Sequence, residues 1–166
     1  VAAAAALTAC SSTNEAVNQA LIEGAVGGIV AADCKIGRSR YWAANATVPV
    51  NEISFRIVMT NVGSKPVTLS GDNFATTLDG TPITPFRFSA RDVGDSDIWR
   101  TYDSLTIRPG EERSVALEYE INQSTYDSWY KSSRTVAVSF TCGNQRVTYT
   151  KNSRSDEITV SDIETL

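Results

Sequence analysis

The sequence of 166 residues contains no histidine. Histidine is the side chain that proteins use most often near pH 7 as a general base or as a ligand for a transition metal. Its absence counts against a catalytic triad and against a histidine-ligated metal centre. We therefore expect a protein that is not an enzyme and that has no cofactor.

The chain also lacks the apolar run of about 18–20 residues that a membrane-spanning helix requires, so any membrane attachment must be made in another way. It has no excess of positive charge: 15 basic residues stand against 19 acidic ones, and the net charge is −4. This sign is wrong for a surface that reads phosphates, and we expect no nucleic-acid partner. Hydrophobic residues make up 42% of the chain, which is enough for the core of one domain.

Three cysteines are present, and they lie too far apart for a CxxC metal or redox motif: Cys10, Cys34 and Cys142. The first follows an alanine-rich stretch, and Leu7-Thr8-Ala9-Cys10 resembles the lipobox of bacterial lipoproteins. The resemblance implies that residues 1–9 are the end of a signal peptide and that Cys10 carries the lipid that attaches the protein to a membrane. It places the protein in the bacterial cell envelope, at the outer membrane or surface in a Gram-negative cell. The alternative is a helical alanine-rich N-terminus with an incidental cysteine.

Residues 10–33 are expected to form a lipidated tether and a helix. The pattern from Ser12 to Glu15 is a capping box, which starts a helix. Apolar residues continue at near-helical spacing through residues 16–33, although Gly24, Gly27 and Gly28 weaken the pattern. These glycines would alternatively allow close packing of the helix.

Strand patterns dominate the rest of the chain, and residues 51–61 alternate most clearly between apolar and polar side chains. Further short strand patterns, separated by turn signals, lie at 66–70, 71–80, 82–90, 98–107, 114–121, 134–142, 145–151 and 156–163. Pro82 and Pro85 favour an edge strand because proline cannot donate to a ladder. The pattern predicts an all-β fold, an immunoglobulin-like antiparallel β-sandwich over residues 34–166.

Two segments carry a resemblance to a known family: FRIVMTNVGSKPVTLSGDNFATTLDGTPI and LTIRPGEERSVALEYEI. Together they resemble the extracytoplasmic immunoglobulin-like domains of bacterial lipoproteins, the DUF4352 and MPT63-like group. The shared pattern runs over residues 51–121: a strand ending in Thr-Asn, a Gly/Lys/Pro turn, a Phe strand closed by Asp-Gly, and a Pro-Gly-Glu turn. The resemblance implies the fold and the compartment, and it brings no catalytic residues.

Cys34 and Cys142 are left as possible partners once Cys10 is lipidated. Because an exported domain lies where disulfides persist, we expect them to form a disulfide. In the chain-entropy model such a bond would stabilise the fold by roughly 4–5 kcal/mol. The alternative is two separate buried thiols, since cysteine is often found inside proteins.

Acidic residues gather in one polar loop, at Asp92, Asp95 and Asp97. Three carboxylates suit a hard cation such as Ca²⁺, but the spacing of an EF-hand is missing. A solvated acidic turn is the preferred interpretation.

Aromatic residues form the other candidate surface, because Thr-Tyr-Asp-Ser occurs at 101–104 and again at 125–128 with tryptophans nearby. The candidate binding residues are Trp99, Tyr102, Tyr126, Trp129 and Tyr130. If these residues form a binding patch, Trp129 and Tyr130 are exposed on a loop; packing of the aromatic residues in the core is the preferred interpretation.

The expected function is a lipid-anchored interaction module of the cell envelope. It would present sandwich edges and aromatic loops to an envelope protein. The alternative is a periplasmic or surface lipoprotein that binds a glycan or small molecule.

Overall fold

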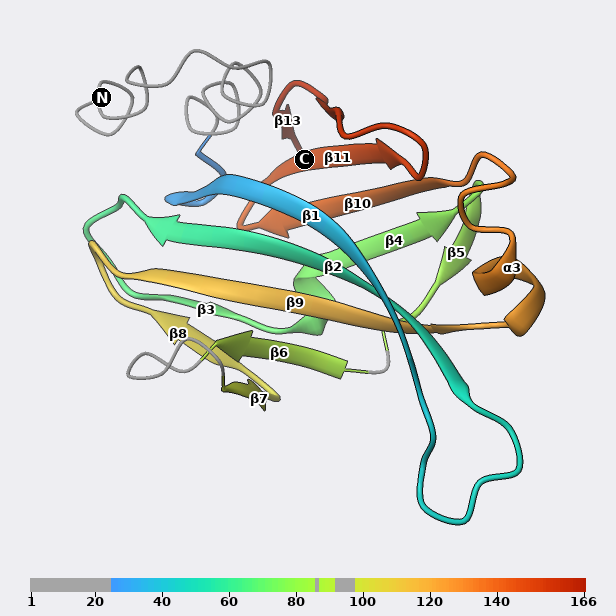
Figure 1. The fold of residues 1–166 in the computed structure, drawn as a ribbon. Helices are drawn as coiled ribbons and strands as arrows, with labels where there is room; N and C mark the ends of the chain where they lie inside the picture. Colours follow the sequence, from blue (N-terminus) through green and yellow to red (C-terminus); the bar gives the residue numbers. More distant parts are fainter. Residues whose placement is uncertain (1–24, 86, 92–97) are drawn as a thin grey trace.

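The alternating segments form the strands of two antiparallel sheets in a computed structural model that describes residues 25–85, 87–91 and 98–166. The first sheet contains, in spatial order, β1 (Ile29–Tyr41), β2 (Val50–Asn61), β9 (Glu112–Ile121), β6 (Arg87–Arg91) and β7 (Trp99–Thr101). The second sheet contains β12 (Ile158–Val160), β11 (Gln145–Asn152), β10 (Thr135–Cys142), β4 (Phe74–Leu78) and β5 (Thr81–Ile83), with β13 (Glu164–Thr165) beside β11. The two sheets stack as a β-sandwich (Figure 1).

Smaller elements connect the sheets. A two-stranded ribbon pairs β3 (Val67–Leu69) with β8 (Leu105–Ile107). The 3₁₀ turn η1 (Gly71–Asn73) precedes β4, and the one short α-helix of the described residues, α3 (Gln123–Asp127), follows β9. No helix in the described ranges is long and apolar enough to cross a membrane.

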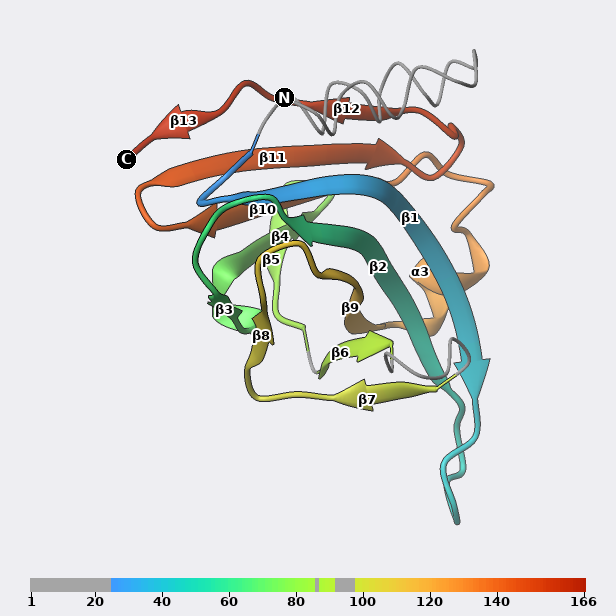
Figure 2. The same cartoon turned by 90° about the vertical axis from the view of Figure 1, so that its left-hand side faces the viewer.

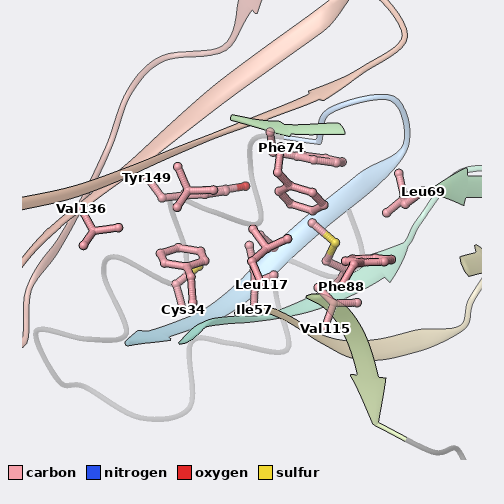
Figure 3. Packing of buried hydrophobic residues seen from close by; sticks show 14 of the residues in the cluster. Cys34, Ile57, Leu69, Phe74, Phe88, Val115, Leu117, Val136 and Tyr149 are labelled. Carbon is pink, nitrogen blue, oxygen red and sulfur yellow. The ribbon is translucent and has the colours of Figure 1, made fainter. Parts of the chain in front are cut away.

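The core lies between the facing sides of the two sheets, where every second residue of a strand points inward. From the first sheet it receives Ile53, Phe55, Ile57 and Met59 of β2, and Val115, Leu117, Tyr119 and Ile121 of β9. Phe55 stacks on Tyr149 of the second sheet with ring centroids 6.3 Å apart. Figure 3 shows Phe74 and Phe88 among these residues, with their centroids 6.1 Å apart. The prediction of an all-β antiparallel sandwich is confirmed.

Turn chemistry agrees with the strand assignment. Gly143, with φ of +62°, begins the two-residue connection between β10 and β11, as a type II′ hairpin requires. Asp79 and Gly80 both have positive φ, 50° and 83°, which is the type I′ pattern between β4 and β5. β5 contains Pro82 and lies at the edge of its sheet, as predicted.

The expected helix over residues 10–33 needs correction at its C-terminal end. Residues from Ile29 onward belong to β1, and the chain turns at Gly27 and Gly28, whose φ values are +59° and +83°. These left-handed conformations are costly for other residues and end any helical continuation. The N-terminal part of that expectation, including the expected lipidation site Cys10, lies outside the described residues.

Candidate interaction surface

The β1–β2 hairpin extends beyond the sandwich and forms a projection that both views show clearly (Figure 1, Figure 2). The pairing of β1 with β2 continues to Tyr41 and Val50, whereas the pairing of β2 with β9 stops at Asn51. Residues 41–50, which we call the hairpin tip, therefore have no third strand beside them. Asn45 has a φ of +61° and closes the turn, as asparagine does readily.

The hairpin tip is apolar and uncharged, with the sequence YWAANATVPV. Its large side chains are exposed: Tyr41 is 41% accessible, Trp42 64% and Val48 66%. Single exposed apolar residues are ordinary on a protein surface, but a cluster of them on a projecting loop is a candidate contact site.

Arginine and tyrosine side chains pack together at the base of the same hairpin. The guanidinium of Arg38 lies 4.5 Å from the ring centroid of Tyr126 and 5.0 Å from that of Tyr130. Arg40 lies 4.3 Å from the ring centroid of Tyr126. We call these four residues the arginine–aromatic surface. Cation–π contacts of this kind hold both partners in defined positions.

Hydrogen bonds fix the two arginines. Arg38 Nη1 donates to the carbonyl of Tyr126 at 2.8 Å. Arg40 donates from Nη2 to Asp127 Oδ1 and from Nε to Asn51 Oδ1, both at 2.7 Å. Helix α3 is thus attached to β1 and β2. The helix itself begins at Asn122, whose side chain accepts from the backbone N–H of Thr125 at 2.7 Å.

The structure separates the predicted aromatic residues. Tyr126 and Tyr130 lie together in the arginine–aromatic surface, and Tyr130 is 58% accessible. Trp129 is only 1% accessible and belongs to the core, so core packing is confirmed for this residue and it is not part of an exposed patch. The turn at α3, with Trp129 N–H donating to the carbonyl of Tyr126 at 3.3 Å, directs neighbouring side chains to opposite sides.

Trp99 and Tyr102 lie on other parts of the molecule. The indole of Trp99 is covered by the guanidinium groups of Arg56 and Arg91, whose carbons lie 5.2 and 5.4 Å from its ring. Tyr102 is partly buried and packs against the core. The two copies of Thr-Tyr-Asp-Ser therefore do not build one surface.

The structure also corrects the expected disulfide, because Cys34 and Cys142 are both free. Cys34 is buried in the core (Figure 3), and burial raises the pKa of its thiol. Cys142 packs against Gly27, seven positions before Cys34 in the chain. The five steps from Ile29 to Cys34 alone span about 16 Å at the rise of a strand, whereas a disulfide needs Cα atoms within about 7 Å.

A cluster of charges lies near the base of the hairpin, on the outer face of the first sheet. Arg87 forms ion pairs with Glu118 and, at 3.4 Å, with Glu52. Burial raises the pKa of Glu52; the nearby Glu118 adds to the rise, while Arg87 and a hydrogen bond from Ser39 oppose it. These groups satisfy one another, and the cluster joins β2, β6 and β9.

The candidate acidic loop, with Asp92, Asp95 and Asp97, lies outside the described residues. Within the described residues, no group of three cysteine or carboxylate side chains is placed to hold a metal ion.

Sequence reasoning missed the hairpin tip. A signal was present, because residues 41–51 form an uncharged segment between Arg40 and Glu52 that contains Tyr41 and Trp42. The segment lacks strand alternation, so the sequence pattern alone does not predict that it projects from the sandwich.

No protein-family model matches the sequence, and no curated protein matches it. Three solved structures are similar at low identity. An uncharacterised β-sandwich protein from Clostridium difficile 630 has a TM-score of 0.44 and 14% identity, over 76% of this chain and 91% of that one. A functionally unknown protein from Listeria monocytogenes EGD-e has a TM-score of 0.40 and 12% identity, over 82% of this chain and 77% of that one. A protein from Archaeoglobus fulgidus has a TM-score of 0.34 and 12% identity, over 81% and 98%. Likenesses this distant say nothing about what the chain binds.

Proposed function

We propose that this protein is a lipid-anchored, non-catalytic interaction module of the bacterial cell envelope, and that it binds an envelope protein through its hairpin tip and arginine–aromatic surface. The lipobox-like Leu7-Thr8-Ala9-Cys10 supports the anchor, with the lipid on Cys10. The resemblance of residues 51–121 to extracytoplasmic domains of lipoproteins supports the compartment.

The observation that carries the proposal is the position of the hairpin tip. The described chain begins at residue 25, and Gly28 lies beside Gly63, at the opposite end of β2 from the tip. β1 alone is 13 residues long, so the tip lies ~40 Å from the start of that strand. A domain held to a membrane by its N-terminal segment would thus present the tip away from that membrane.

The residue types at this end of the molecule suit a protein partner. Tryptophan, tyrosine and arginine supply most of the binding energy in protein interfaces, and each large contribution is about 2 kcal/mol or more. Arg38 and Arg40 are already held by α3, which lowers the entropy lost when a partner binds. The partner would need an apolar groove for Trp42 and Val48, with acidic groups beside it for Arg38.

The test places a photo-crosslinking amino acid at position 42 in the full-length protein, expressed with its complete signal peptide in its own host. A matched sample carries the same amino acid at position 144, an exposed turn at the other end of the sandwich. We expect one dominant protein adduct from position 42 and none from position 144. Equal or absent adducts from both positions would contradict the proposed surface.

The anchor is tested separately by changing Cys10 to Ser. We expect the unchanged protein to partition into detergent and to incorporate a labelled fatty acid, and the variant to do neither. A protein that stays unlabelled with Cys10 intact would refute the anchor while leaving the crosslinking result unaffected.

A further inference from the structure

A cavity of about 350 Å³ opens between β1, the segment that follows α3, and the turn from β11 to β12. This volume is at the lower end of the range of about 300–1,000 Å³ that is typical of small-molecule sites. The cavity is separate from the hairpin tip and shares only Tyr130 with the arginine–aromatic surface.

Part of the cavity lining is apolar. Its lining includes Trp129 and Cys34, both buried, and Ile36 and Ile158, both partly buried and packed against the core. The backbone at Trp129 is held by a hydrogen bond from Ser153 Oγ to its carbonyl at 2.8 Å. A preformed apolar surface of this kind binds an apolar side chain without large rearrangement.

The rest of the lining carries balanced charge: two aspartates, Asp33 and Asp156, and two lysines, Lys35 and Lys151. Lys35 and Asp33 form an exposed ion pair at 3.5 Å, which is a weak contact in water and is readily exchanged. Lys151 Nζ donates to the carbonyl of Ser155 at 2.9 Å, which uses one of its three N–H groups. Among the described residues no side chain donates to the carboxylate of exposed Asp156.

We propose that this cavity binds a small zwitterion, namely an amino acid or dipeptide with an apolar side chain. Carboxylate oxygens of the ligand would accept hydrogen bonds from the lysines, and its ammonium group would donate to the aspartates. The apolar side chain would lie against Ile36 and Ile158, the apolar lining residues that are only partly buried. A lining with charges of both signs around an apolar surface matches this class, because each charged end of the ligand finds an opposite charge.

The site does not depend on the proposed partner surface or on the lipid anchor. Lys151 and Asp156 lie outside the arginine–aromatic surface, and Trp42 lies outside the cavity. Changing Trp42 to Ala should therefore leave ligand binding intact, and changing Asp156 to Asn should leave crosslinking at position 42 intact. Failure of one proposal is thus distinguishable from failure of the other.

The experiment titrates the full chain carrying Cys10→Ser with L-alanyl-L-phenylalanine, and measures heat together with the chemical shift of the Trp129 indole N–H. We expect saturable binding that moves this signal. The comparison compound is N-acetyl-L-phenylalaninamide, which has the same side chain and no charge. We expect it to bind about tenfold more weakly or worse, because it lacks both charge-assisted contacts.

Two single variants test the charged part of the lining. Lys151→Gln and Asp156→Asn should each weaken dipeptide binding about tenfold, while the matched surface variants Lys131→Gln and Asp162→Asn should not change it. The proposal is overturned if the dipeptide gives no heat and no shift up to ~10 mM. It is also overturned if the uncharged amide binds equally well, or if methyl glucoside binds and the dipeptide does not.

Discussion

The two ends of the sandwich differ in how their polar and apolar groups are used. At the end where β2 meets β3, the side chain of Asn61 is fully buried and makes three hydrogen bonds: it donates to the carbonyls of Lys65 and Ile107 at 2.7 and 2.9 Å, and accepts from Gly63 N–H at 2.9 Å. At the other end, the hairpin tip exposes Trp42 and Val48 to solvent. One end is closed by satisfied polar groups, and the other leaves apolar groups without a partner. The contrast teaches that the same strands end in satisfied polar groups on one side of the sandwich and in solvent-exposed apolar groups on the other.

The largest expected effect comes from removing the buried indole of Trp129, the residue next to Tyr130 of the arginine–aromatic surface. Trp129→Ala should lower the free energy of unfolding by about 3–5 kcal/mol, because it removes a buried aromatic side chain. Trp42→Ala should change it by less than ~0.5 kcal/mol, since that side chain is exposed. Chemical denaturation of both variants makes the measurement. Equal losses in the two variants would show that the tip is part of the folded core.

The next largest effect is expected from removing the buried side chain of Asn61, at the end where β2 meets β3. Asn61→Ala should cost about 2–4 kcal/mol, because buried backbone groups lose their partners. Asn144→Ala, at an exposed turn, is the control and should be neutral within ~0.5 kcal/mol. Urea unfolding of both variants gives the two numbers. If Asn61→Ala leaves the free energy of unfolding unchanged, water replaces the hydrogen bonds that the Asn61 side chain makes at this end.

A smaller difference is expected between two glycine variants, Gly27→Ala beside Cys142 and Gly80→Ala in the turn between β4 and β5. Gly27 and Gly80 both have positive φ, but a Cβ on Gly27 would lie 2.8 Å from Cys142 Cβ, whereas nothing lies within 4 Å of a Cβ on Gly80. Both alanine variants carry the cost of the left-handed conformation, roughly 1–2 kcal/mol. Only Gly27→Ala adds a clash, and we expect it to cost about 1–2 kcal/mol more. Thermal unfolding of the pair checks this, and equal melting temperatures would show that the loop shifts freely.

The smallest effect is a pH dependence at the base of the hairpin. Because burial raises the pKa of Glu52 above the ordinary value of 4.5, the folded state holds this proton more tightly than the unfolded state. The resulting stability is fully present below the unfolded pKa and is lost as the pH rises through the folded pKa. Glu52→Gln should therefore gain stability relative to the unchanged protein as the pH rises above the ordinary glutamate pKa of 4.5. The exposed Glu120→Gln is the control, and parallel pH profiles for Glu52→Gln and the unchanged protein would refute the assignment.

Strand positions were predictable because alternation is a local property that each segment carries by itself. Residues 51–61 and 114–121 show it, and both form central strands of the first sheet. Contacts between distant segments were not predictable in the same way. Nothing in the spacing of Cys34 and Cys142 reveals that one lies in the core and the other beside Gly27.

The candidate site was predicted only in part, and the reason is again physical. Tyr126, Trp129 and Tyr130 differ in exposure because a single short helical turn orients them, and five residues are too few to show helical periodicity. The projection of the hairpin depends on where β9 stops pairing with β2, at Asn51, which is a property of two strands together.

The pairing of β2 with β9 also determines how early the first sheet can form during synthesis. β2 ends at Asn61 and β9 begins at Glu112, so about fifty residues must be synthesised before the first sheet can gain its central pairing. At ~5–20 residues per second, the ribosome takes on the order of 3–10 s for this stretch. During that interval β1 and β2 can close as a local hairpin, but the inner edge of β2 stays unpaired. Because an open strand edge joins other strands readily, the nascent hairpin is exposed to wrong pairing during that interval.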